Sequence, residues 1–284
     1  MKTVLVLTDF STNAMHAAEM AIQIADELNL NILLFNVYFS LPLIPASEND
    51  AWSKSYEIFK KESEEGLQNE VKRLYEIFET DRPGAVKPHI ECLAAFGDLG
   101  DHINDLQDKK NIDFMVMGAR KKQQSFLLFG DDINAVIKNA KKPVLIVNDV
   151  LNFKETKNIV LTAGVAGSDA KAIACLRSLS YQMKLKVHVA YTSPAENSGE
   201  KEKINALLEP LQHDKSENIS FHHLKGENIV KELVAFNASI PADLLAIVHK
   251  KRSFLWDLFN ESITEEFIAT SQISILIIPE LHVQ

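Results

Sequence analysis

The stretch Lys2-Thr3-Val4-Leu5-Val6-Leu7-Thr8-Asp9 is a short apolar run that ends in two polar residues. Runs of this length that are rich in β-branched residues are typical of buried strands in a parallel sheet, whose two faces are both covered. The stretch has a counterpart in Lys157-Asn158-Ile159-Val160-Leu161-Thr162-Ala163-Gly164. The repetition indicates two copies of one structural unit in a single chain.

Three further strand-like runs recur in the same order in the two halves: 31–37 with 186–192, 113–118 with 243–248, and 143–147 with 274–278. Apolar residues at helical spacing separate the runs of the first half. The first set follows the candidate N-cap Ser11, and the third follows Gly130. The three sets are Ala14, Ala18, Ala21, Ala25 and Leu28; Leu67, Val71, Leu74 and Phe78; and Ile133, Val136, Ile137 and Ala140. Strands that alternate with helices predict an α/β fold of right-handed βαβ units in an open, doubly wound sheet.

The chain has 284 residues, 46% of them hydrophobic, which suits two cores better than one. A mostly polar stretch over 149–156 separates the halves, and we expect domains at 1–149 and 155–284. The halves differ most between Ser40 and Arg82, where two prolines indicate a loop and a helix with Trp52, Tyr56 and Phe59 follows. These aromatic residues are consistent with core packing or with a partner-binding surface.

The net charge of −9 argues against binding to nucleic acid or to an anionic membrane, unless a local basic patch dominates. The first apolar run has only five residues before polar ones follow, too short for a signal peptide or a membrane span, so we expect a cytoplasmic protein. Two cysteines without CxxC spacing indicate neither a disulfide framework nor a cysteine metal site. His222 and His223 are adjacent in a strand-like run and so point to opposite faces, and we expect no metal site.

A ligand site in an open parallel sheet lies beyond the carboxyl ends of the strands. The residues that follow strands in the first half are Thr8, Asp9, Val37, Tyr38 and the segment 118–122. Gly130 opens a helix, an arrangement that lets backbone N–H groups face an anion.

Four segments in this order, TDFS over 8–11, DFMVMG over 113–118, LLFG over 127–130 and AKKPVLIV over 140–147, resemble a universal stress protein domain. The resemblance covers residues 1–148 strongly and 155–284 faintly. It implies two five-stranded parallel sheets of strand order 3-2-1-4-5. Because members pair through their last strands, it also implies an internal pseudo-dimer with 144–147 beside 275–278.

The nucleotide-binding branch of this family holds ATP with a G-x2-G-x9-G-(S/T) loop. By this resemblance, Asp9 and the backbone of Val37 match adenosine-contacting positions, and Gly118 and Gly130 match the first and last loop glycines. Three features depart from the pattern: Lys121 replaces the second glycine, the loop is one residue shorter, and Asp131 followed by Asp132 replaces the Ser/Thr.

These departures predict a weakened phosphate site. Lysine does not easily adopt the backbone geometry of a loop glycine, and a carboxylate at Asp131 would repel a phosphate. Asp131 is also consistent with a helix cap. Arg120, Lys121 and Lys122 could hold a phosphate with side chains instead, or could form a solvated face; a basic trio recurs at 250–252.

The second half departs further, since Gly164 replaces the aspartate, and Val248 and Asn260 replace the two glycines. The sequence contains no GxSxG, HExxH or P-loop motif. We therefore expect a non-enzymatic, universal stress protein-like stress-response protein that acts by protein association, with a largely degenerate nucleotide site and no cofactor. The alternative is an ATP or AMP sensor that binds nucleotide weakly in the first domain. A further homodimer is compatible with either function, and the protein partner is unknown.

Overall fold

The computed structural model describes residues 2–38, 49–119, 131–148, 155–163, 169–192, 218–224, 229–240, 242–249 and 273–279. The chain divides near residue 150 into two compact units, which we call domain 1 (described residues 2–148) and domain 2 (described residues 155–279). The boundaries expected from the sequence, 1–149 and 155–284, stay predictions.

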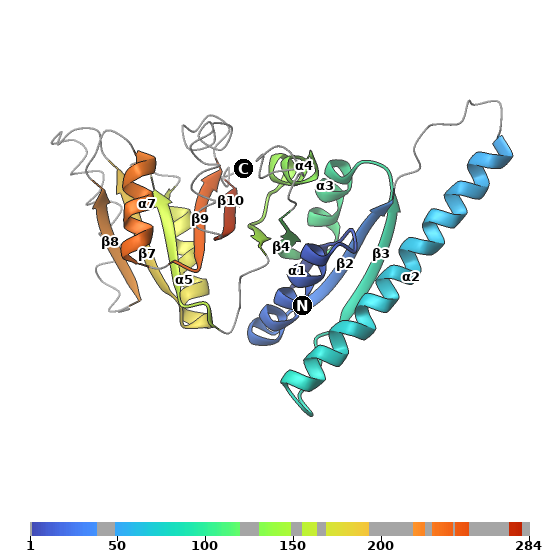
Figure 1. The fold of residues 1–284 in the computed structure, drawn as a ribbon, viewed down its shortest axis with the longest axis horizontal. Helices are drawn as coiled ribbons and strands as arrows, with labels where there is room; N and C mark the ends of the chain where they lie inside the picture. Colours follow the sequence, from blue (N-terminus) through green and yellow to red (C-terminus); the bar gives the residue numbers. More distant parts are fainter. Residues whose placement is uncertain are drawn as a thin grey trace. The chain divides into compact units, whose positions relative to one another are not determined.

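Domain 1 alternates strands and helices along its whole length (Figure 1). Its elements are β1 (Thr3–Leu7), α1 (Thr12–Leu28), β2 (Asn31–Tyr38), α2 (Asn49–Asp81), β3 (Ile90–Phe96), α3 (Leu99–Lys109), β4 (Ile112–Gly118), α4 (Asp131–Asn139) and β5 (Val144–Val147). The strands are parallel and lie in the order β3-β2-β1-β4-β5. The predicted doubly wound fold and strand order are therefore confirmed for domain 1.

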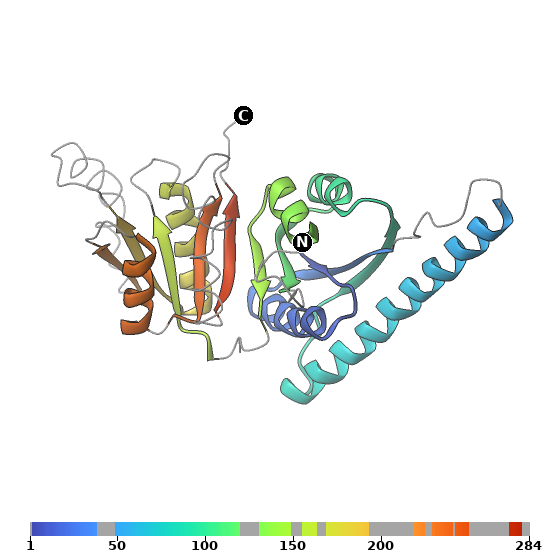
Figure 2. The same ribbon diagram turned by 45° about the horizontal axis from the view of Figure 1, so that its top comes forward.

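Helices cover both faces of this sheet, as Figure 2 shows. Neighbouring residues of a strand point to opposite faces. The Phe35 ring of β2 packs edge-on against His102 of α3, with ring centroids 5.7 Å apart. The next residue, Asn36, accepts a hydrogen bond from Ser63 of α2. Helices α2 and α3 therefore lie on opposite faces, and the buried side chains of β1 and β2 form the core between them.

An ion cluster joins α1 to α2 on one face. Arg73 of α2 binds the carboxylate of Glu70 through two nitrogens, at 2.6 and 2.8 Å, and also pairs with Glu19 of α1. It donates a further hydrogen bond to the Met15 carbonyl at 2.9 Å. The Glu70 side chain is only 5% exposed, so this cluster compensates a buried charge.

Helix α2 is one continuous helix of 33 residues, about 50 Å long, whereas the eight residues of β2 span about 26 Å. Its first turns therefore extend past the sheet (Figure 1). Of the predicted stripe, Leu67, Leu74 and Phe78 are buried, but Val71 is half-buried because the neighbouring Glu70 occupies the inner position.

The predicted aromatic stripe of α2 is only partly packed. Tyr56 packs against Tyr38 and Phe96, with ring centroids 5.8 and 5.7 Å away, and burial with the Tyr56 hydrogen bond raises the pKa of Tyr38 to about 12. Phe59 stays 39% exposed. The Trp52 side chain lies outside the part of the chain that the structure describes.

Domain 2 repeats the arrangement with β6 (Asn158–Ala163), α5 (Asp169–Met183), β7 (Lys186–Thr192), β8 (Ile219–Leu224), α7 (Ile229–Ser239), β9 (Leu244–His249) and β10 (Ser274–Pro279). The strands are parallel and lie in the order β8-β7-β6-β9-β10, which is again 3-2-1-4-5. Two tandem α/β domains of one type are thus confirmed. Pairing of the domains through their last strands stays a prediction.

No helix among the described residues is both long and apolar enough to cross a membrane.

Candidate functional site

A cavity of about 480 Å³ lies in domain 1 at the carboxyl ends of β1, β2 and β4. Its walls also include the first residues of α3 and α4. The lining residues are Leu7, Thr8, Asp9, Ala14, Phe35, Asn36, Val37, Asp98, Leu99, Met117, Gly118, Asp132, Ile133 and Ala135. The cavity is where a ligand of an open parallel sheet is expected, and its volume suits a small organic molecule.

Asp9 lies at the cavity with its carboxylate held by the turn that follows β1. Ser11 donates two hydrogen bonds to Asp9 Oδ1, from its backbone N–H at 3.1 Å and from its hydroxyl at 2.6 Å. Ser11 is also the N-cap of α1 and accepts a hydrogen bond from the backbone N–H of Ala14. The start of α1 thus orients a carboxylate at the cavity.

Val37, the second predicted site residue, lines the cavity beside a buried polar residue that the sequence patterns did not single out. Asn36 donates to the Thr8 carbonyl at 2.7 Å, and Ser63 of α2 donates to Asn36 Oδ1 at 2.6 Å. Asn36 and Ser63 are both buried. These bonds join β1, β2 and α2 behind the cavity, so the wall at Val37 is built by long-range contacts.

Gly118 lines the cavity at the end of β4 and touches the start of α1. A Cβ at this position would lie 2.4 Å from the backbone carbonyl carbon of Asn13. The Asn13 side chain also donates a hydrogen bond to the Ala119 carbonyl. Any larger residue would push α1 away from β4, so Gly118 is required for helix packing whether or not a ligand approaches it.

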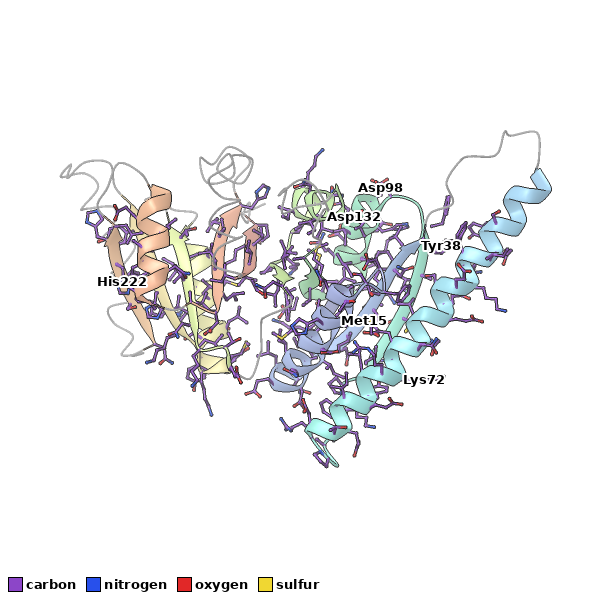
Figure 3. All side chains as sticks on the ribbon, in the orientation of Figure 1. Met15, Tyr38, Lys72, Asp98, Asp132 and His222 are labelled. Carbon is purple, nitrogen blue, oxygen red and sulfur yellow. The ribbon has the colours of Figure 1, made fainter. Side chains whose placement is uncertain are left out.

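Three acidic residues contribute to the cavity walls: Asp9, Asp98 and Asp132. Asp98 is the N-cap of α3 and accepts a hydrogen bond from the backbone N–H of Asp101 at 3.1 Å. Asp132 lies in the first turn of α4. Figure 3 labels Asp98 and Asp132 at the starts of these two helices. This wall of the cavity is therefore acidic.

The remaining predicted site residues cannot be placed. Arg120, Lys121 and Gly130 lie outside the described residues, as does Lys122. Asp131 is the first residue of α4, and its side chain is not among those described. Their roles at the site stay predictions.

The corresponding edge of domain 2 is built differently. Val248 of β9, which replaces the first loop glycine, is a buried side chain with 3% exposure. Gly164, Asn260 and the second basic trio lie outside the described residues. Among the side chains that the structure does describe, no group of three or more His, Cys, Asp or Glu could hold a metal ion.

The chain is similar to known proteins over its first half and, in fold, over its whole length. The model of the universal stress protein family matches residues 1–148. Universal stress protein MJ0531 of Methanocaldococcus jannaschii is 32% identical over 147 residues, which are 51% of this chain and 81% of that protein.

One solved structure extends the likeness in fold to the whole chain. A universal stress protein from Archaeoglobus fulgidus superposes with a TM-score of 0.70 at 16% identity, covering 98% of this chain and 96% of its own. A universal stress protein solved in complex with cAMP matches 51% of this chain and 96% of its own at 23% identity, with a TM-score of 0.37.

Proposed function

The chain belongs to the universal stress protein family, and from this premise we propose a non-enzymatic stress-response protein that acts by association with other proteins. In this proposal the nucleotide site of domain 1 is degenerate toward phosphate groups. Domain 2 binds no nucleotide.

The acidic wall of the cavity supports this proposal most directly. Asp98 and Asp132 come from the two helix starts that border the cavity, where backbone N–H groups would otherwise attract an anion. Two like unit charges 5 Å apart repel by about 3 kcal/mol at an effective dielectric constant near 20. One such pair would reduce the affinity for a phosphate group about a hundredfold.

The cavity itself favours a second candidate function, a small-molecule sensor of the ATP or AMP type. Its volume and the fixed carboxylate of Asp9 suit a ligand with hydroxyl groups that can donate hydrogen bonds. The two candidates differ in the ligand that they predict. A degenerate site binds adenosine better than AMP and AMP better than ATP, whereas a nucleotide sensor shows the reverse order.

Titration calorimetry of the full chain with adenosine, AMP, ATP and cAMP separates these candidates. We expect the double variant Asp98→Asn/Asp132→Asn to bind ATP about ten to a hundred times more tightly than the natural chain, with little change for adenosine. Asparagine keeps the N-cap of α3. Asp105→Asn is the matched control, because Asp105 is an exposed carboxylate of α3 that pairs with Lys109 outside the cavity.

Tight, stoichiometric ATP binding by the natural chain that is lost in Asp9→Ala would overturn the degenerate site and establish the sensor. No binding of any of the four ligands would leave protein association as the function. Release of ADP from ATP by the purified chain, absent in Asp9→Ala, would contradict the non-enzymatic proposal.

We also propose a cytoplasmic location, intrachain pairing through 144–147 and 275–278, and an unidentified protein partner, with homodimer formation as a further possibility. Cell fractionation tests the first of these. Sedimentation of the purified chain over a range of concentrations measures the oligomeric state.

A further inference from the structure

Two histidines and a serine form a hydrogen-bonded chain inside domain 2, away from the strand ends. His188 of β7 and His222 of β8 lie on the same face of the sheet, with ring centroids 5.5 Å apart. Ser220 Oγ lies 2.9 Å from His188 Nδ1 and 2.8 Å from His222 Nε2. His188 Nε2 lies 3.2 Å from Asn158 Oδ1 of β6. The chain thus crosses three neighbouring strands.

The partners at one end fix where the protons lie. Asn158 Oδ1 can only accept, so His188 Nε2 carries a hydrogen and the Nδ1 of the neutral ring accepts. Ser220 then donates its hydroxyl hydrogen to His188 Nδ1 and accepts from His222 Nε2–H. Each of these three contacts has one donor and one acceptor when both rings are neutral.

The chain also lies under a helix. The His222 ring packs against Phe236 of α7, with centroids 4.7 Å apart and planes inclined by 52°. Figure 3 labels His222 in the layer between β8 and α7. Both histidines are half-buried. The contact between α7 and the sheet therefore includes the His222 ring, which the hydrogen bonds link to His188.

Domain 1 has leucines at the places of both histidines. The registers of β2 with β3 and of β7 with β8 align His188 with Leu33, Ser220 with Glu91, and His222 with Leu93. Leu33 is buried. Phe236, the eighth residue of α7, aligns with Leu106, the eighth residue of α3. The histidine chain is therefore a property of domain 2 alone.

The surroundings disfavour charge on either ring. Burial lowers the pKa of both histidines, and His222 and Lys186 lower that of His188 further. Among the side chains that the structure describes, the charged groups on or beside these strands and α7 include Lys157 before β6, Lys186 at the start of β7, Glu232 of α7, and Asp243 before β9. The Asp243 carboxylate accepts from the backbone N–H groups of Lys157 and Asn158 and so is already engaged.

We propose that the chain of His188, Ser220 and His222 is an acid-sensitive latch that holds α7 on the sheet when both rings are neutral and releases it when both are protonated. A first proton is accommodated if Ser220 turns its hydroxyl hydrogen away and accepts from both rings. A second proton places two positive rings side by side under α7, and the helix separates from β8.

The sign of the pH dependence follows from the direction of the shifts. Because the pKa values are lower in the closed state than the ordinary value near 6.5, stabilisation is complete above pH 6.5 and is lost as the pH falls below it. A histidine can stay neutral while α7 is on the sheet and titrate with a pKa near 6.5 once α7 is released. Such a histidine raises the equilibrium constant for release of α7 up to about tenfold between pH 7.5 and 5.5. Two such rings give an upper limit of about a hundredfold.

Hydrogen exchange of the full chain, followed by mass spectrometry at pH 7.5 and 5.5 and corrected for intrinsic rates, tests the latch. We expect protection of peptides from β8 and α7 to fall five- to a hundredfold at pH 5.5, while protection of β1 and β2 changes less than twofold. Equal protection of β8 and α7 at the two pH values would overturn the proposal.

The variant His188→Leu/His222→Leu copies domain 1 at both positions, and we expect it to lose the pH dependence. The control His89→Gln changes an exposed histidine of domain 1 and should keep it. A pH dependence that persists in the double variant would contradict the latch. If the double variant does not fold, proton NMR of the natural chain decides, because the latch requires two histidines with midpoints below 6.5.

Discussion

Domain 1 and domain 2 share one strand order but have different types of residue at corresponding positions. Leu33 of β2 lies under α3 as a buried apolar residue, whereas His188 takes the corresponding place in domain 2 and forms hydrogen bonds. The end of β4 is Gly118, pressed against α1, whereas the aligned Val248 of β9 has a buried side chain. The fold therefore depends on the order of the strands and on which positions are buried. The types of residue at those positions differ between the two domains.

The largest effects should come from the central strands, where the domains are most alike. Leu5 of β1 and Leu161 of β6 are both fully buried. We expect Leu5→Ala and Leu161→Ala to lower the free energy of unfolding by about 2–5 kcal/mol each, through lost burial and the cavity left behind.

Urea unfolding can assign each loss to one domain. Trp52 and Trp256 are the two tryptophans, one in each half, so single-tryptophan variants report on the halves separately. If both substitutions shift both fluorescence transitions equally, the domains unfold as one unit and the comparison between them fails.

At the end of the fourth strand, a larger side chain should destabilise domain 1, whereas a smaller one should destabilise domain 2. Gly118→Ala adds a methyl against the Asn13 backbone and should destabilise domain 1 by about 1–3 kcal/mol. Val248→Ala removes two buried methyl groups and should destabilise domain 2 by about 2 kcal/mol. Thermal unfolding by circular dichroism measures both changes. A stable Gly118→Ala variant would mean that α1 can shift, and Gly118 would then be explained by a ligand rather than by packing.

The smallest effect concerns where the first helix begins. Helix α1 starts five residues after the end of β1, and α5 starts six residues after the end of β6. Ser11→Ala removes the N-cap of α1 and should cost domain 1 about 1 kcal/mol, whereas Ser11→Asn retains a capping oxygen and should stay close to the natural chain. Equal stability of both variants would show that packing alone sets the start of α1.

The sequence predicted the strands of the central sheet well because their signal is local. The runs at 31–37 and 186–192 differ from β2 and β7 by one residue or none. In contrast, β3 and α3 were not identified. The strand is apolar apart from Glu91, and Leu99, Ile103 and Leu106 recur at helical spacing in α3, so both elements do carry a local signal, although a short one. Neighbouring strands and helices, which no local pattern records, hold these two elements in place.

The candidate site was predicted in part, because some of its residues directly follow strands in the sequence. Asp9, Val37 and Gly118 follow strands in the sequence, and all three line one cavity. Asn36, Asp98 and Asp132 also line it, but they come from separate parts of the chain, and Asn36 is held there by a hydrogen bond to Thr8, 28 positions away. The packing role of Gly118 against Asn13 depends on a contact across more than a hundred residues and could not be anticipated.

The place of β1 between β2 and β4 has a consequence for synthesis on the ribosome. Val6 pairs with Val116, 110 residues later, whereas Val160 in domain 2 pairs with Leu245, 85 residues later. At about 5–20 residues per second, β1 waits roughly 6–22 s for its second neighbour and β6 roughly 4–17 s. During that interval one edge of the central strand in each nascent domain is unpaired. Chaperones that cover such edges have more time to act on domain 1, although it is made first.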